Sequence, residues 1–146
     1  MKKRESMKAA SKDTKDMTHV AGKRKRAVAR VSVRKGSGIV RVNNLRLEAF
    51  QPAMARMKIM EPLQLAGNLT KEVDITITMH GGGIMGQAES ARLGVARALV
   101  NYTGDAKLEK TFLDYDRHLL VADVRRKEVA KPNVSKARAK RQKSYR

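Results

Sequence analysis

The residues with the most distinctive chemistry form a glycine-rich loop in the middle of the chain, GGGIMGQ at positions 81–87. Glycines let a backbone adopt positive φ angles and let a bulky partner approach closely. The segment that follows, AESARLGVARAL, has the apolar spacing of a helix, and a helix N-terminus offers unpaired N–H groups and partial positive charge to a phosphate. The pattern therefore favours phosphate binding, and a tight strand-to-helix turn without a ligand is the alternative.

The loop does not match the known patterns for nucleotide phosphates. A P-loop needs Gly-x4-Gly-Lys-[Ser/Thr], with the Lys on the β- and γ-phosphates and the hydroxyl on Mg²⁺. Gly81 and Gly86 have the required spacing, but Gln87 and Ala88 occupy the Lys and hydroxyl positions. The dinucleotide-binding pattern is not matched either. Phosphates of a polymer are favoured, and a phosphotransferase that binds nucleotide at residues 81–86 is the alternative.

Other catalytic or metal-binding groups do not form a recognisable pattern. The chain has no cysteine, which excludes disulfides, thiol catalysis and thiolate zinc sites. His19, His80 and His118 are far apart in the sequence, and none has a histidine partner four residues on. Ser90 does not lie in a nucleophile-elbow pattern. We therefore expect a protein that is not an enzyme and that holds no cofactor and no metal.

Basic residues are concentrated at the two ends of the 146-residue chain, which has 33 Lys and Arg against 14 Asp and Glu and a net charge of +19. Residues 1–35 hold 13 basic and 3 acidic side chains, for a net charge of +10, and residues 125–146 hold 10 and 1, for +9. Residues 36–124 hold ten of each. A neutral centre between two basic arms is unlike a small-molecule enzyme and indicates a polyanionic partner, most commonly nucleic acid.

An anionic membrane is the competing partner, but it would require an amphipathic helix with Trp or Phe on one side. The chain has no Trp and only 2 Phe. It also has no apolar run of about 18 residues that could span a bilayer, and its first residues lack the apolar segment of a secretory signal. The sequence therefore predicts a soluble cytoplasmic protein that binds RNA or DNA, without a membrane or small-molecule partner.

The elements that would position the loop follow from hydrophobic periodicity. Residues 23–33 alternate as a strand, with alanines and valines on one face and Arg24, Arg26, Arg30 and Arg34 on the other. Turn residues at 35–38 predict a hairpin with a second strand at 39–42. An arginine-bearing face suits a strand between a core and an anionic surface, and a merely solvated face is the alternative.

The remaining elements alternate between helix and strand. We expect a helix within residues 50–66, with Met54 and Met57 packed in the core, and a strand at 73–79. A helix over 88–102 should end at Gly104 and be followed by a shorter helix at 107–113 and a strand at 119–124. The predicted fold class is α/β (α+β), a small two-layer sandwich of one mostly four-stranded sheet with helices mainly on one face.

Domain boundaries follow the charge distribution. We expect a basic, disordered extension at residues 1–20, a globular domain at 21–124 and an extended basic tail at 125–146. The tail has too few apolar residues to offset the entropy of ordering by itself. On a nucleic acid it would order as it releases counterions from phosphates. A solvated tail that only confers solubility is the alternative.

Three segments resemble the family of the universal ninth protein of the small ribosomal subunit. They are GKRKRAVARVSVRKGSGIVRVNN at 22–44, GGGIMGQAESARLGVARAL at 81–99, and the closing DYDRHLLVADVRRKE with KARAKRQKSYR. The ending QKSYR resembles the archaeal and eukaryotic branch. The resemblance covers about residues 20–146 and implies a structural constituent of the small subunit, with a fold like the second domain of ribosomal protein S5 and a left-handed βαβ crossover.

The resemblance also implies partners and binding residues. Members bind the 3′ domain of the ribosomal RNA in the subunit head, beside neighbouring small-subunit proteins, and extend a C-terminal tail to the peptidyl-site tRNA. Carried over to this chain, the tRNA contact would fall on Lys143, Ser144, Tyr145 and Arg146. The predicted rRNA-binding residues are Lys23, Arg24, Lys25, Arg26, Arg30, Arg34, Gly82, Gly83, Gln87, Arg92, Arg125, Arg126, Lys127, Lys136, Arg138, Lys140 and Arg141.

Two departures from the family pattern concern the arms. Residues 133–136, Asn-Val-Ser-Lys, replace the usual glycine-rich joint of the tail, and residues 1–20 extend beyond the usual start. Besides the nucleotide-binding phosphotransferase, a general chromatin-type DNA binder is a third hypothesis. It would bind duplex DNA and structured RNA with similar affinity.

Overall fold

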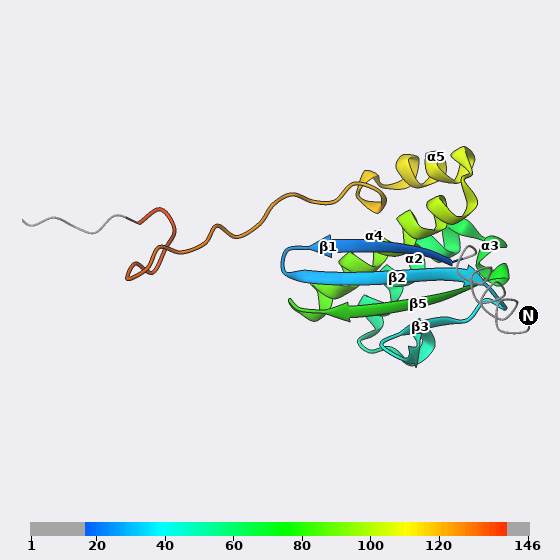
Figure 1. The fold of residues 1–146 in the computed structure, drawn as a ribbon, viewed down its shortest axis with the longest axis horizontal. Coiled ribbons are helices and arrows are strands. Elements are labelled where there is room, and N and C mark those ends of the chain that lie inside the picture. The colour runs from blue at the N-terminus through cyan, green and yellow to red at the C-terminus, as the bar shows by residue number, and fades with distance from the viewer. Residues whose placement is uncertain (1–16, 140–146) are drawn as a thin grey trace, which may run out of the picture.

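The computed structural model describes residues 17–139, which fold into a five-stranded sheet and helices with the basic C-terminal segment leading away from them (Figure 1). In chain order the elements are β1 (Met17–Arg24), β2 (Ala27–Lys35), β3 (Val40–Val42), β4 (Leu45–Arg46), η1 (Leu47–Ala49), α2 (Ala53–Ala66), α3 (Leu69–Glu72), β5 (Val73–His80), α4 (Ile84–Thr103), α5 (Ala106–Tyr115) and η2 (Arg117–Leu119). The predicted α+β class is confirmed. The described helices include none long and apolar enough to cross a membrane.

The sheet has the strand order β1-β2-β5-β3-β4. β2 pairs antiparallel with β1 on one side and with β5 on the other, and β3 pairs parallel with β5 and antiparallel with β4. The predicted hairpin between residues 23–33 and 39–42 is therefore wrong, because β5 lies between these two strands. The parallel pair β3 and β5, joined through α2, forms a βαβ unit, and its left-handed crossover stays a prediction.

Two sheet boundaries also differ from the sequence prediction. β1 begins at Met17, so residues 17–20 belong to the sheet although the sequence analysis placed them in the N-terminal extension. The predicted strand at 119–124 is wrong, because Leu119 is the last residue of η2 and residues 120–124 follow it without strand structure. Its backbone is held instead by a side chain of α4, as Arg97 Nε donates a 2.7 Å hydrogen bond to the Leu120 carbonyl. The Leu120 carbonyl thus accepts a hydrogen bond from a side chain, and not from the backbone of a neighbouring strand.

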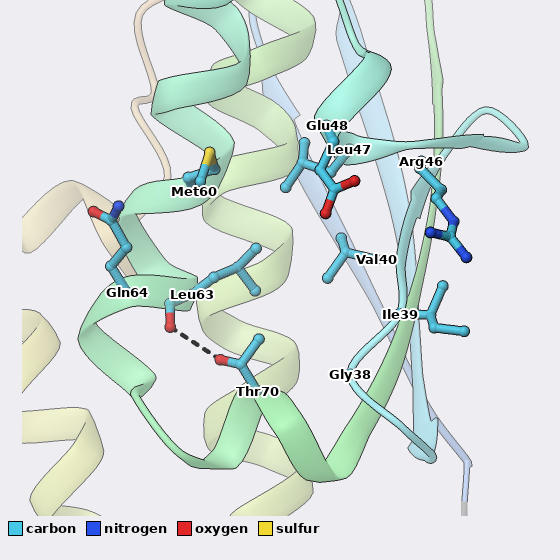
Figure 2. A pocket seen from close by; sticks show the side chains of 10 residues that line it. All are labelled: Gly38, Ile39, Val40, Arg46, Leu47, Glu48, Met60, Leu63, Gln64 and Thr70. Carbon is cyan, nitrogen blue, oxygen red and sulfur yellow. Dashed lines mark hydrogen bonds between the residues drawn. The ribbon is translucent and has the colours of Figure 1, made fainter.

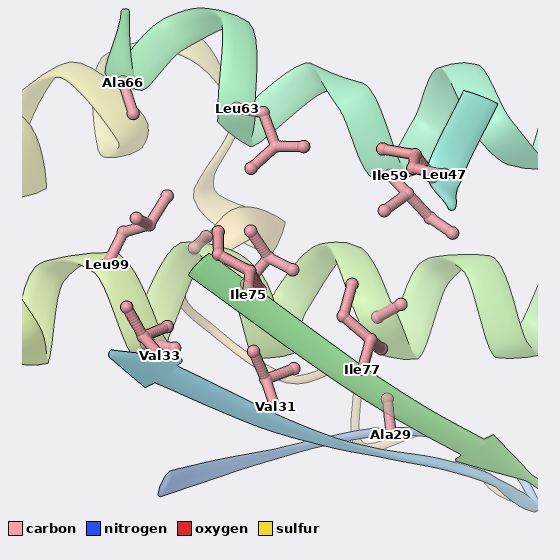
Figure 3. Close-up of a cluster of buried hydrophobic side chains, with 14 of the residues drawn as sticks. Ala29, Val31, Val33, Leu47, Ile59, Leu63, Ala66, Ile75, Ile77 and Leu99 are labelled. Atoms are coloured by element: carbon pink, nitrogen blue, oxygen red, sulfur yellow. The ribbon is translucent and has the colours of Figure 1, made fainter. Parts of the chain in front are cut away.

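The helices cover one face of the sheet, as predicted. α4 packs directly on β1 and β2, and α2 packs against α4. Figure 3 shows the core between these layers, where Ile59 and Leu63 of α2 face Ile75 and Ile77 of β5. The inward residues of β2 are alanines and valines, which leave room for α4 to approach closely. This packing fixes the position of the α4 N-terminus relative to the β1–β2 turn.

Helix ends and faces agree with the sequence in part. α2 ends at Gly67 and α4 at Gly104, both with positive φ, and α5 covers the predicted short helix. Met54 and Met57 were predicted in the core, but they are 65% and 58% exposed. The buried face of α2 is instead built from other residues, among them Ala55 and Ile59, and Pro62 is accommodated within the helix.

Candidate nucleic-acid interface

A basic cleft of about 740 Å³ lies at the end of the sheet where β1 turns into β2. Three segments that are far apart in the sequence form it: the β1–β2 turn, the glycine loop after β5, and the start of the C-terminal segment. Its lining residues are Arg24, Lys25, Arg26, Ala27, Gly82, Gly83, Gly86, Arg125, Arg126 and Lys127. Eight of the predicted rRNA-binding residues are thus brought together in this basic cleft.

Two glycines of the loop are required by the fold itself. Gly81 and Gly82 have φ angles of +71° and +64°, a region that side chains rarely adopt. A Cβ at Gly81 would lie 2.7 Å from the Arg26 carbonyl oxygen, and one at Gly82 would lie 2.9 Å from the Ala27 nitrogen. Gln87 Nε2 donates a 3.1 Å hydrogen bond back to the Gly81 carbonyl. The loop is therefore packed on the β1–β2 turn.

The other two glycines, Gly83 and Gly86, also line the cleft, but neither backbone angle nor space requires glycine there. Gly83 has an ordinary φ of −110°, and a Cβ there would meet no atom within 4 Å. A Cβ at Gly86 would make ordinary contact with Ala27 at 3.5 Å. Both residues lie at the beginning of α4, where the first N–H groups of a helix have no intrahelical acceptor. The cleft wall therefore combines a helix N-terminus with an open surface, the arrangement that suits a phosphate.

An ion-pair cluster holds the C-terminal segment beside the cleft. Arg24 Nε lies 2.7 Å from a Glu89 carboxylate oxygen of α4, and Arg24 Nη1 lies 2.6 Å from an Asp123 carboxylate oxygen. Asp123 also accepts hydrogen bonds from the Arg125 side chain and backbone N–H, which hold the pKa of this carboxyl well below its usual range. Arg24 thus joins β1, α4 and the start of the C-terminal segment.

Arg92 forms a second cluster away from the cleft. Its guanidinium pairs with Glu61 of α2 and with Asp116 before η2, and its side chain is only 13% exposed. Burial alone would raise the pKa of Asp116, but hydrogen bonds from the His118 backbone N–H and from Arg92 outweigh it and lower the pKa. The guanidinium groups of Arg24 and Arg92 are therefore occupied within the protein. Both residues had been predicted as RNA ligands, and the structure gives them positions that order the domain.

Four cations of the cleft are exposed and are not neutralised by the protein. Lys25, Arg26, Arg126 and Lys127 are exposed, and within residues 17–139 none of them forms an ion pair. Lys25 lies in the two-residue turn between β1 and β2 and has a φ of +53°. Since these four positive charges share one concave surface, their mutual repulsion would be relieved by a bound polyanion.

The remaining predicted residues lie elsewhere. Lys23 is exposed near the end of β1, and Arg30 and Arg34 are exposed on the sheet face opposite the helices. Lys136 and Arg138 lie on the C-terminal segment, where Arg138 pairs with Glu128 at 2.9 Å. Lys140, Arg141 and the four predicted tRNA-binding residues at 143–146 lie outside the described residues.

The carboxylates that organise the interface were missed by sequence reasoning. Glu89, Asp116 and Asp123 stand at no diagnostic spacing from Arg24 or Arg92, so only the fold brings them together. Among residues 17–139, no group of three or more His, Cys, Asp or Glu could hold a metal ion.

A second hollow, of about 330 Å³, lies between α2 and the β3–η1 region (Figure 2). More of its lining surface is apolar than polar, with contributions from Ile39, Val40 and Leu63. The Thr70 hydroxyl donates a 2.9 Å hydrogen bond to the Leu63 carbonyl within it. It contains none of the residues that the sequence predicted to bind phosphate. The basic cleft is therefore the better candidate for function.

A small α+β domain with a glycine-walled cationic cleft and a basic C-terminal segment is typical of proteins that bind nucleic-acid backbone in ribonucleoprotein assemblies. Residues 22–146 match the family described as ribosomal protein S9/S16. The chain is also 48% identical over 126 residues to the small ribosomal subunit protein uS9 of Methanothrix thermoacetophila, an alignment that covers 86% of this chain and 96% of that relative.

The chain therefore belongs to the ribosomal protein S9/S16 family, as the sequence motifs predicted. It is a structural, non-enzymatic component of the small ribosomal subunit, located within the ribosome in the cytoplasm. Family membership also excludes the phosphotransferase alternative for the glycine loop.

Proposed function

We propose that the basic cleft binds ribosomal RNA in the head of the small subunit and so anchors the domain beside neighbouring ribosomal proteins. The observation that carries this proposal is the convergence of three separate segments on one cleft with exposed, unneutralised cations. Because Gly83 and Gly86 leave the α4 N-terminus open, a phosphate has access to the unpaired N–H groups there. Recognition is by backbone and shape, with little base readout.

The cleft also provides a starting point for the tail. Arg125, Arg126 and Lys127 lie at the point where the chain leaves the domain, so an RNA strand in the cleft would lead directly onto the basic C-terminal segment. That segment has no helix or strand between residues 125 and 139, and it would order by counterion release along an RNA groove. The division into a domain that ends at residue 124 and a basic arm at 125–146 is part of this proposal, with the N-terminal boundary of the domain moved from residue 21 to Met17, where β1 begins.

The cleft is tested by a variant that removes three exposed charges, Lys25→Gln, Arg126→Gln and Lys127→Gln. Its affinity for small-subunit ribosomal RNA should fall, and the slope of log Kd against log salt should decrease by about 3 because each phosphate contact contributes roughly one unit. A matched control removes three exposed lysines remote from the cleft, Lys71, Lys107 and Lys110. Equal effects in the two variants would mean that only total charge matters, and the cleft proposal would be wrong.

The last four residues, Lys143 to Arg146, are proposed to contact the peptidyl-site tRNA. A terminal arginine offers a planar donor set suited to phosphates, and a tyrosine offers a ring that stacks on a base or sugar. Deleting residues 143–146 should leave incorporation into small subunits intact and weaken tRNA binding at the peptidyl site of those subunits. Normal tRNA binding, or loss of incorporation, would contradict this role.

A further inference from the structure

We propose that the face of the sheet opposite the helices is a second RNA-binding surface, separate from the basic cleft, so that the domain holds two RNA segments at once. This inference rests on the proposed rRNA binding and adds a site to it. The surface, called the open sheet face below, is formed by the outward residues of β1, β2, β5 and β3. Its occupant is the sugar–phosphate backbone of RNA.

Strand register places the outward residues in rows. One row crosses four strands, since His19 lies opposite Ser32, Ser32 opposite Thr76, and Thr76 opposite Arg41. The His19 ring and the Ser32 hydroxyl confirm this alignment with a 2.9 Å hydrogen bond. Directly opposite residues on neighbouring strands lie close enough to act on one ligand. The row therefore presents two hydroxyls between an imidazole and a guanidinium.

Arginines flank this row along β2. Arg30 lies opposite Thr78, and Arg34 lies opposite Asp74. Both arginines are exposed, and four residues of strand place them about 13 Å apart. Arg41, two strands away from β2, is exposed as well. The three guanidinium groups thus surround the hydroxyl row on an area several strands wide.

The one carboxylate on these rows is already occupied. Asp74 accepts hydrogen bonds from the backbone N–H groups of Ile39 and Ser37, at 3.1 and 2.9 Å, and these lower its pKa. Arg34 lies 3.7 Å from the same carboxylate, and its side chain remains 61% exposed. The open sheet face is therefore electropositive, and its arginines are available to an anion.

The surface chemistry fits RNA better than protein. The outward residues of β1, β2, β3 and β5 include no Phe, Tyr or Trp, so they offer mainly backbone and 2′-hydroxyl contacts, and only His19 and His80 present a ring on which a base could stack. Met17, at the start of the edge strand β1, is the one large exposed apolar residue among these outward positions. Others, such as Met54, Met57 and Tyr115, lie on helices. A protein interface would be expected to have such residues at its centre. The helices cover the other face, so none of the helices within residues 17–139 lies over the strands on this side (Figure 1).

The test is hydroxyl-radical footprinting of small-subunit ribosomal RNA bound to the full-length protein. The sheet variant is Arg30→Gln with Arg34→Gln and Arg41→Gln, the cleft variant is the Lys25, Arg126 and Lys127 triple to Gln, and the control is the Lys71, Lys107 and Lys110 triple to Gln. All three lose three positive charges. We expect the sheet variant to lose protection of one RNA tract, with the tract affected by the cleft variant still protected, and to weaken affinity about tenfold or more.

Each other outcome overturns the inference in an identifiable way. An unchanged footprint for the sheet variant, with loss of protection for the cleft variant, would refute the second surface and leave the proposed function standing. If neither the sheet variant nor the cleft variant loses protection of any RNA tract, the proposed function is refuted. An unchanged RNA footprint with loss of a neighbouring protein from reconstituted subunits would assign the face to protein. If the triple variant is unstable to heat, Arg30→Gln with Arg41→Gln keeps the Arg34–Asp74 contact and allows the same comparison.

Discussion

Gly82 and Gly83 are neighbours in the wall of the basic cleft, but the fold requires glycine only at position 82. At Gly82 the φ angle is +64° and a Cβ would lie 2.9 Å from the Ala27 nitrogen and 3.0 Å from its Cβ. Left-handed backbone costs a non-glycine residue about 1–2 kcal/mol, and forced contact in a packed region about 1–3 kcal/mol. Gly82→Ala should therefore lower the free energy of unfolding by about 2–5 kcal/mol and the Tm by roughly 10 °C.

Substitution of Gly83 should leave stability almost unchanged and weaken RNA binding instead. Its backbone suits any residue and its Cβ would project into open space, so Gly83→Val should change stability by less than about 1 kcal/mol. If a phosphate is bound at the N–H groups of the α4 N-terminus, the valine would displace it. Loss of one charge-assisted hydrogen bond is equivalent to about 1.5–3 kcal/mol, which weakens RNA binding about 10- to 100-fold.

The two substitutions are compared by thermal unfolding and by filter binding to small-subunit ribosomal RNA at fixed salt. The expected result is a normal Tm with weakened binding for Gly83→Val, and a lowered Tm for Gly82→Ala. A Gly83→Val protein that binds RNA with the wild-type Kd would show that no phosphate occupies this position. A wild-type Tm for Gly82→Ala would refute the steric argument for the loop.

Three further predictions concern the frame that holds the cleft. Gly22→Ala should prevent stable folding, because the added Cβ would lie 2.0 Å from the Ser90 carbonyl oxygen of α4. Circular dichroism would detect the loss of helix. A folded variant would contradict the close approach of β1 to α4. Phe112→Ala should cost about 3–5 kcal/mol, measured by urea unfolding, because Phe112 is fully buried in the core. The lowered pKa of Asp74 makes its carboxylate stabilising above its ordinary pKa of 3.8, and this contribution is lost as pH falls through the folded-state pKa. The Tm difference between wild type and Asp74→Asn should therefore be largest near neutral pH and narrow below about pH 4, and a constant difference would contradict this assignment.

Local patterns in the sequence predicted those elements whose own residues determine them. The alternation in β2 and β5 and the helical spacing in α4 each reflect a buried face that the element carries by itself. The position of β5 between β2 and β3 depends on pairing between distant segments, and no local pattern encodes it. The predicted single strand at 23–33 is wrong, because a turn at residues 25–26 separates the end of β1 from β2. The rest of β1 was not predicted because its inward side includes Gly22 and Arg24 rather than a row of apolar residues. Gly22 is small because α4 lies against it, a requirement visible only in the fold.

The glycine loop and the basic segments could be identified from the sequence, but their assembly into one cleft could not. The cleft brings together Lys25, Gly83 and Arg126 for two reasons. α4 packs against β1, and the ion pair between Asp123 and Arg24 holds the C-terminal segment beside them. Sequence reasoning also treated all arginines alike. The structure distinguishes those paired with carboxylates from those that remain free.

That distinction explains how a segment with no net charge can belong to a strongly basic surface. Residues 36–124 contain equal numbers of acidic and basic side chains, but several of their carboxylates face inward-lying arginines rather than the cleft. Glu89 and Asp123 pair with Arg24, and Glu61 and Asp116 pair with Arg92. Because these four carboxylates pair with Arg24 and Arg92, they do not neutralise the exposed cations nearby. Within residues 17–139, no ion pair is formed by Lys25, Arg26, Arg126 and Lys127 of the cleft or by Arg30 and Arg41 of the open sheet face. The protein thereby keeps a folded domain and an RNA-binding surface within one short chain.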